Sequence, residues 1–139
     1  MILVDTSVWI DHINATDPML TTLLAEERVL AHPYVIGEIS LGSLRDRDVV
    51  LGALLDLPRA PVATPEETFY LIEREGLFNR GIGYVDTSLL ASARLQPGIT
   101  IWTRDKRLKK VADELNLGAM LAQRPGWNGA TCACSIEAR

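Results

Sequence analysis

Short apolar runs alternate with stretches of helical periodicity along residues 1–123. Three runs are too short for a helix and predict strands buried on both faces, at residues 2–4, 29–31 and 99–102. Elsewhere the apolar residues recur at helical spacing, most regularly over residues 108–115. Because parallel neighbours need crossover connections, this alternation predicts a small α/β sandwich whose central parallel sheet is covered on both faces.

Capping residues and prolines mark the expected helix starts. Thr64, Pro65 and Glu67 form a capping-box arrangement. Asp17 before Pro18 is a second N-cap followed by a proline. Further helices are expected from Pro33, over residues 49–55, from about Asp86 after a glycine-containing loop, and after Asp105 until Gly118. The segment 5–7, directly after the first strand, is predicted to be a polar turn.

The length and composition are those of one globular domain. The chain has 139 residues, of which 47% are hydrophobic, close to a single-domain prior of roughly 150. We expect the domain to cover residues 1–123, because this part has no repeat or linker, and residues 124–139 to be a C-terminal tail without an assigned role. Cys132 and Cys134 lie in that tail, and two such ligands do not make a zinc site.

Charge and hydropathy narrow the class of protein. No apolar run reaches the roughly 18 residues of a membrane span, and no secretory signal is expected, so we predict a cytoplasmic protein without a membrane partner. The formal net charge is −4, which argues against a simple nucleic-acid binder. Any contact with RNA then depends on local charge. The main cluster of cations, which by itself could be a solvated helix face, consists of Arg104, Lys106, Arg107, Lys109 and Lys110.

Four acidic residues stand where predicted strands end or the next helices begin. Asp5 and Asp105 follow strands, Glu38 lies just over one turn into the helix after the second strand, and Asp86 follows the glycine-containing loop. Each aspartate has a structural alternative as an N-cap, and Glu38 has one as a solvent-exposed residue. Because reactive groups gather beyond the carboxyl ends of strands in open α/β sheets, we expect all four to share one pocket.

Four negative charges in one pocket require a raised pKa or a counter-ion. All-oxygen ligands select hard metal ions, and Mg²⁺ or Mn²⁺ fits such a set equally well. A bound ion of this kind turns water into hydroxide near neutral pH and stabilises a leaving oxygen. The residues therefore predict hydrolysis of a phosphodiester bond.

The segments around these acids resemble the PIN-domain family and, more narrowly, the VapC toxins of bacterial and archaeal toxin–antitoxin modules. The resemblance covers about residues 1–121 and includes Glu38 in its helix. The matching segments are Asp5-Thr6-Ser7-Val8-Trp9-Ile10-Asp11, Gly83-Tyr84-Val85-Asp86-Thr87-Ser88-Leu89-Leu90-Ala91 and Thr103-Arg104-Asp105. The resemblance implies a PIN-like three-layer α/β/α sandwich with a small central parallel sheet.

The same resemblance implies an endoribonuclease that depends on Mg²⁺ or Mn²⁺. Asp5, Glu38, Asp86 and Asp105 match the family's metal-binding, catalytic acids. Ser7 and Thr103 match its hydroxyl positions, and Thr6 is a weaker candidate for supporting the site. The resemblance also implies a homodimer, an antitoxin of the VapB type, and structured RNA targets such as tRNA or rRNA loops.

Other side chains are weighed as RNA contacts. Arg80, Arg104, Lys106 and Arg107 flank the expected pocket in sequence and could contact phosphates. Trp9 and Tyr84 could stack on a splayed base, but apolar aromatics next to strands are more often part of the core, which is the role we predict for both.

Three other hypotheses remain open. His12 and His32 could act as general base and acid in metal-free RNA cleavage. The chain could be a Mg²⁺-binding phosphoacceptor domain, although its acids are spaced differently from that layout. It could also be a non-catalytic binding module, if the acids do not converge.

Overall fold

Three short parallel strands form the centre of the molecule. The computed structural model describes residues 1–121, so the predicted tail over 124–139 lies outside the described residues. The strands are β1 (Ile2–Val4), β2 (Val29–Leu30) and β3 (Thr100–Trp102), and β1 pairs in parallel with both of the others in the order β2-β1-β3. The predicted parallel sheet is confirmed, with strand ends that differ by one residue.

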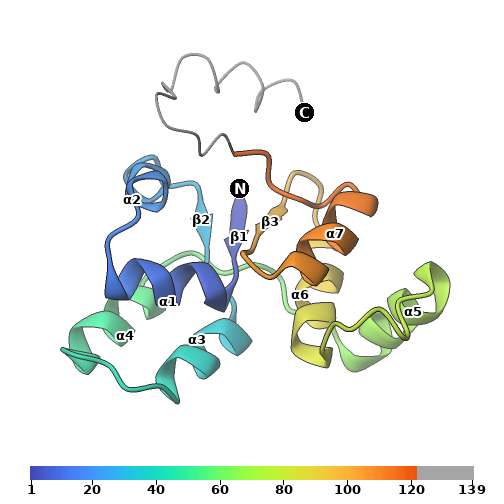
Figure 1. Cartoon of the computed structure of the whole chain (residues 1–139), viewed down its shortest axis with the longest axis horizontal. Helices are drawn as coiled ribbons and strands as arrows, with labels where there is room; N and C mark the ends of the chain where they lie inside the picture. The colour runs from blue at the N-terminus through green and yellow to red at the C-terminus, as the bar shows by residue number, and fades with distance from the viewer. Residues whose placement is uncertain (122–139) are drawn as a thin grey trace.

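Helices cover both faces of this sheet. Ile2, Leu3 and Val4 point to alternate faces and all are buried. In Figure 1, α1 to α4 lie on the β2 side of the sheet and α5 to α7 on the β3 side. The helices are α1 (Thr6–Asn14), α2 (Pro18–Ala25), α3 (Pro33–Ser40), α4 (Arg47–Leu55), α5 (Pro65–Glu75), α6 (Tyr84–Arg94) and α7 (Lys106–Glu114). The arrangement is the expected PIN-like α/β/α fold.

Local capping explains where several helices begin. Thr64 and Glu67 form the predicted capping box at α5, and Asp17 caps α2 through the backbone amides of Met19 and Leu20. The prediction of a polar turn over residues 5–7 is wrong, because α1 begins at Thr6. Its early start puts the hydroxyls of the first turn beside the end of β1.

The strand order creates a switch point at the carboxyl end of β1. The chain leaves β1 to form β2 on one side and returns as β3 on the other. Val4 is in register with Trp102, and the amide of Asp5 donates to the carbonyl of Trp102 at 2.9 Å. Such switch points are where open α/β sheets place their ligands, so the fold brings Asp5 next to Thr103.

The helices of residues 1–121 give no sign of a membrane span, since none of them is both long and apolar enough.

Candidate active site

Asp5 is the most enclosed acid of the predicted set. Its side chain is buried, with 5% of its surface exposed. The hydroxyls of Ser7 and Thr103 both donate to its Oδ2, at 2.8 and 2.7 Å. Asp5 occupies the N-cap position of α1 but makes no side-chain cap bond. Its carboxylate is therefore held by one hydroxyl from the first turn of α1 and one from the end of β3, and it is not used to cap the helix.

The backbone of the segment 103–105 orients these hydroxyls. The amide of Arg104 donates to Ser7 Oγ at 3.0 Å, and the amide of Asp105 donates to Thr103 Oγ1 at 3.1 Å. Each hydroxyl oxygen thus accepts from a main-chain amide and turns its own hydrogen toward Asp5.

Glu38 is linked to the same region through Thr6. Glu38 lies on the exposed side of α3, and the Thr6 hydroxyl donates to its Oε1 at 2.7 Å. This bond joins the first turn of α1 to α3. Of the two hydroxyls that follow Asp5, that of Ser7 therefore donates to Asp5 and that of Thr6 donates to Glu38.

Asp86 shows that the four acids act on one another. It lies half-buried in the first turn of α6, whose N-cap is Gly83. Burial raises the pKa of Asp86 to about 6, and repulsion from Asp5, Asp105 and Glu38 adds to the rise. The fold has therefore brought all four carboxylates within electrostatic range.

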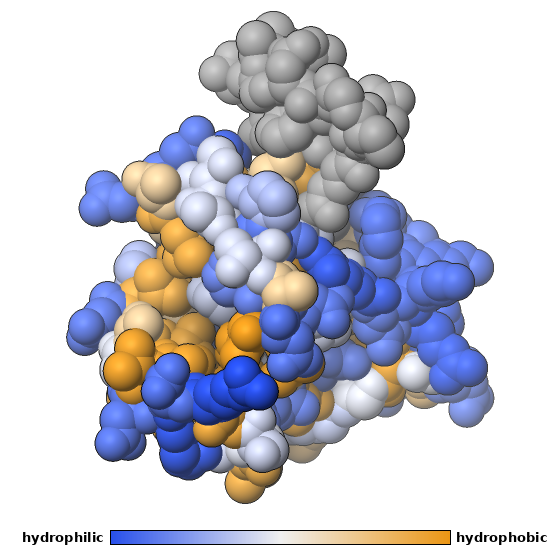
Figure 2. Space-filling model, turned by 60° about the vertical axis from the view of Figure 1, so that its left-hand side comes forward, coloured by the Kyte–Doolittle hydropathy of each residue, from blue (hydrophilic) through white to orange (hydrophobic). Residues whose placement is uncertain are grey.

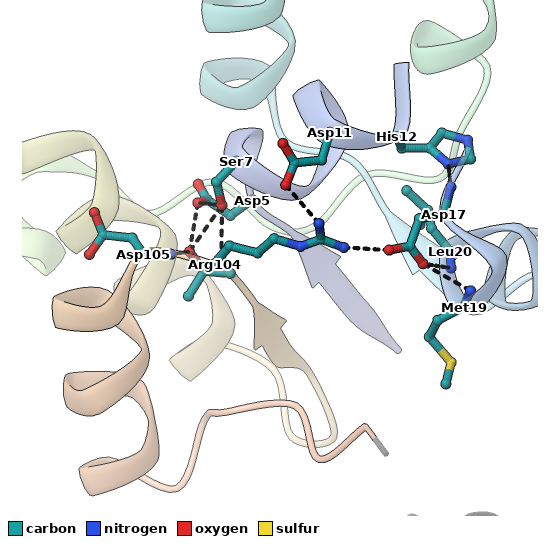
Figure 3. Close-up of polar contacts among 10 residues, drawn as sticks. Asp5, Ser7, Asp11, His12, Asp17, Met19, Leu20, Arg104 and Asp105 are labelled. Atoms are coloured by element: carbon teal, nitrogen blue, oxygen red, sulfur yellow. Dashed lines mark hydrogen bonds and ion pairs between the residues drawn. The ribbon is translucent and has the colours of Figure 1, made fainter. Parts of the chain in front are cut away.

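Asp105 has a second, structural role. Its Oδ1 accepts from the amides of Arg107 and Leu108 and caps α7. Figure 3 shows its carboxyl group to the side of Asp5 and not against it. The N-cap alternative thus holds for Asp105, whereas Asp5 makes no side-chain cap bond and Asp86 lies inside the first turn of α6, after its N-cap Gly83.

The acids fit a divalent cation in donor type and charge. Their oxygens are hard ligands, and within residues 1–121 no Lys, Arg or His forms an ion pair with any of the four. In the same part of the chain, no three His, Cys, Asp or Glu side chains are placed to hold one ion together. This agrees with the repulsion that the other three acids exert on Asp86, because charges repel one another over longer distances than a metal ion can bridge. The side chains would have to turn toward an ion to bind it.

The basic residues divide into paired and exposed ones. Arg80 donates to both carboxylate oxygens of Glu114, at 2.9 and 2.8 Å. Arg104 is paired with two aspartates. The other four members of the predicted cluster, Lys106, Arg107, Lys109 and Lys110, lie on α7 and are exposed, and Lys109 pairs with Asp113 at 2.7 Å. Arg107 lies against Gly81, where an added Cβ would come within 2.9 Å of its side chain.

The two histidines have structural roles. His32 is fully buried, accepts from the amide of Tyr34 at Nδ1 (3.1 Å) and lies 3.0 Å from Ser92 Oγ through Nε2. His12 accepts from the amide of Asp17 at 3.0 Å. A buried His32 cannot reach a substrate, so the structure contradicts the histidine-based hypothesis.

The two aromatic predictions have different outcomes. Trp9 is 5% exposed and belongs to the core, as predicted. Tyr84 is 45% exposed and pairs with Phe69 of α5, with ring centroids 6.1 Å apart, so its assignment to the core is wrong. Its position in the first turn of α6 leaves the ring outside the packed interior.

Sequence reasoning missed the partners of Arg104. Asp11 and Asp17 both bind its guanidinium (Figure 3). Asp17 was recognisable only as a helix cap, and Asp11 only as the end of a motif. No local signal in the sequence links either residue to Arg104.

Comparison with known proteins agrees with this geometry. The family model described as PIN domain matches residues 2–114. Two proteins from two strains of Mycobacterium tuberculosis, both named Ribonuclease VapC32, are each 50% identical over 114 residues, which is 82% of this chain and 92% of each relative. The chain therefore belongs to the PIN-domain family and, within it, groups with the VapC proteins.

Proposed function

We propose that this protein is a metal-dependent endoribonuclease toxin that cuts structured RNA, such as tRNA or rRNA loops. The observation that carries the proposal is the buried Asp5 carboxylate at the switch point of the sheet, which the hydroxyls of Ser7 and Thr103 hold. Besides burial, repulsion from Asp5, Asp105 and Glu38 contributes to the raised pKa of Asp86, which supports the convergence of the four acids. The similarity to proteins named ribonuclease supports RNA as the substrate. A phosphoacceptor or an inert binding module has no comparable support.

The four acids would hold Mg²⁺ or Mn²⁺. Bound there, such an ion would activate water for attack on phosphorus and would stabilise the leaving oxygen. The hydroxyls of Ser7 and Thr103 orient the carboxylate of Asp5, and the hydroxyl of Thr6 orients that of Glu38. Lys106 and Arg107 are exposed at the start of α7 and are our candidates for phosphate contacts.

The test is cleavage of total cellular RNA by the purified protein, with Mn²⁺, with Mg²⁺ and with EDTA. We expect discrete cuts that need the metal and leave 5′-phosphate ends. Asp5→Ala and Asp86→Asn should each lower the rate at least about a hundredfold, the size seen when one electrostatic catalytic group is removed. Glu26→Gln removes an exposed carboxylate elsewhere and should cut normally.

Two results would contradict the proposal. Cutting that persists in EDTA would exclude the metal. A folded Asp5→Ala protein that still cuts at the normal rate would remove the four acids from the mechanism.

We further propose that a VapB-type antitoxin neutralises the protein. Its expected surface is the apolar hollow of about 520 Å³ lined by residues of α1 and α4, among them Trp9, Ile13 and Val49. Figure 2 turns this side of the molecule forward and shows an orange apolar patch between hydrophilic side chains. Val49, which is 72% exposed, lies in this hollow beside other apolar side chains, and a contiguous exposed apolar patch is typical of a surface that a partner covers.

Co-purification with the product of the adjacent upstream gene tests this partner. Val49→Asp should weaken the complex at least tenfold, because a charge would be buried in an apolar contact. RNA cleavage should be unchanged, because α4 contributes none of the four acids. Val62→Asp is the matched control at another exposed valine. Binding that is equally strong in both variants would exclude the hollow, and no binding to the wild type would exclude the antitoxin.

A homodimer and a cytoplasmic location complete the proposal. Light scattering after size-exclusion chromatography should give twice the chain mass of 15.3 kDa. A monomeric mass over a hundredfold concentration range would argue against the dimer, and recovery in a membrane or secreted fraction would argue against the location.

A further inference from the structure

Arg104 connects three parts of the molecule through its guanidinium. It follows Thr103 and precedes Asp105, at the end of β3. Its Nη1 donates to Asp11 Oδ2 of α1 at 2.6 Å, and its Nη2 pairs with Oδ2 of Asp17, the N-cap of α2. Figure 3 shows the side chain extended between these two carboxylates.

The main chain of Arg104 is fixed at the same time. Its amide donates to Ser7 Oγ at 3.0 Å, and its guanidinium carbon lies 5.8 Å from the ring centroid of Trp102. The segment 103–105 is therefore held at both its backbone and its longest side chain. Thr103 and Asp105, the two neighbours of Arg104, are the ones that contact Asp5 and cap α7.

The guanidinium is poorly suited to contact RNA from this position. Both carboxylates neutralise its charge, and the side chain of Asp17 is only 14% exposed. The other oxygen of Asp17 accepts from the amides of Met19 and Leu20. Moving Arg104 to a phosphate would leave a largely buried carboxylate without its cation, which is unfavourable.

We propose that Arg104 is a positioning residue. Its pairing with Asp11 and Asp17 fixes the segment 103–105, so that the Thr103 hydroxyl meets Asp5 and Asp105 stays at the start of α7. The expected effect of this pairing on RNA cleavage rests on the proposed function. Its expected effect on the order of the segment 103–105 does not.

Four variants test the pairing. Arg104→Gln removes the cation, and Asp11→Asn and Asp17→Asn each remove one partner. Asn is a good N-cap, so Asp17→Asn keeps the start of α2. The double variant Arg104→Gln with Asp11→Asn tests whether the residues act as one unit. Glu26→Gln, which breaks an exposed ion pair with Arg28, is the matched control.

The first readout is hydrogen exchange of the amides of residues 104 and 105, measured without metal or RNA. We expect exchange at least tenfold faster in the three single variants and unchanged rates in the control. Unchanged exchange in Arg104→Gln would overturn the proposal. This readout holds whether or not the wild-type protein binds metal or cuts RNA.

The second readout separates positioning from RNA binding. We expect about tenfold lower kcat, an unchanged KM and about fivefold weaker Mn²⁺ binding by calorimetry in each single variant. The double variant should be no worse than the single ones, as expected for groups that act as a unit. A higher KM in Arg104→Gln together with tighter RNA binding in Asp11→Asn would show that Arg104 contacts RNA, and would overturn the proposal.

Discussion

Asp86 and His32 show how burial changes the chemistry of single side chains in this protein. Asp86 has a pKa raised to about 6, whereas His32 has one lowered to about 4. Both shifts follow from burial, which disfavours the charged form of either group. The free energy of unfolding falls with rising pH because of Asp86 and with falling pH because of His32. Each effect is therefore best measured with a variant that removes one of the two groups.

Asp86→Asn should stabilise the metal-free protein near neutral pH. Between about pH 4 and pH 6 the folded protein keeps a proton on Asp86 that the unfolded chain has lost, so stability falls as the pH rises through this range. Solvent screening of a half-buried group limits the gain in the variant to about 1 kcal/mol at pH 7.5. Urea unfolding in EDTA at pH 4 and pH 7.5 measures it, and a variant less stable than wild type at pH 7.5 would contradict the repulsion.

His32 should make the protein sensitive to acid. The unfolded chain takes up a proton on His32 below about pH 6.5, whereas the folded protein does so only below about pH 4. Stability is therefore lost as the pH falls from 6.5 to 4, by about 2 kcal/mol. Unfolding of the Asp86→Asn protein over this range isolates the effect. Adding His32→Asn should flatten the profile, and a profile that stays equally steep would exclude His32 as its cause.

Among the elements, α5 depends most plainly on local sequence. Its capping box satisfies two backbone amides at once, with Glu67 accepting from Thr64 at 2.8 Å and Thr64 accepting from Glu67 at 3.1 Å. The start of α7 shows a different case, since Asp105 caps it and also takes part in the repulsion on Asp86. The local sequence around Asp105 is that of an ordinary N-cap, so it does not reveal that the residue also lies near the other acids.

Thr64→Ala should lower the free energy of unfolding by about 1 kcal/mol, because the amide of Glu67 loses its acceptor at the start of α5. Thr64→Ser keeps the hydroxyl and should have little effect. Denaturant unfolding of the three proteins compares them. RNA cleavage should be the same in all three, and a defect confined to Thr64→Ala would link α5 to the site.

For the whole molecule, a divalent cation held by the four carboxylates would make stability depend on metal. A divalent cation that binds only the folded protein, at a hundred times its Kd, should add about 2.7 kcal/mol to the free energy of unfolding. Thermal unfolding with Mn²⁺ and with EDTA measures this gain, which we expect to be absent in Asp5→Ala. A gain of equal size in Asp5→Ala would place the ion elsewhere.

The sequence by itself determined the strands, most helix starts and which four acids lie near the ends of the strands and the starts of the helices. These features depend largely on local chemistry, because short apolar runs favour buried strands, and capping residues and prolines favour helix starts. The α/β sandwich followed from the same alternation, and its PIN-like form was implied by the resemblance of the motifs to that family.

The tertiary structure decided which partners these residues meet. Arg104 pairs with Asp11 across 93 positions, and His32 meets Ser92 across 60. No local pattern encodes such contacts, because they arise only when separate elements pack together. Packing also left Tyr84 outside the core and assigned Thr6 to Glu38 and Ser7 to Asp5. The burial of Asp5 and the repulsion on Asp86 at the switch point likewise follow from where the strands and helices meet.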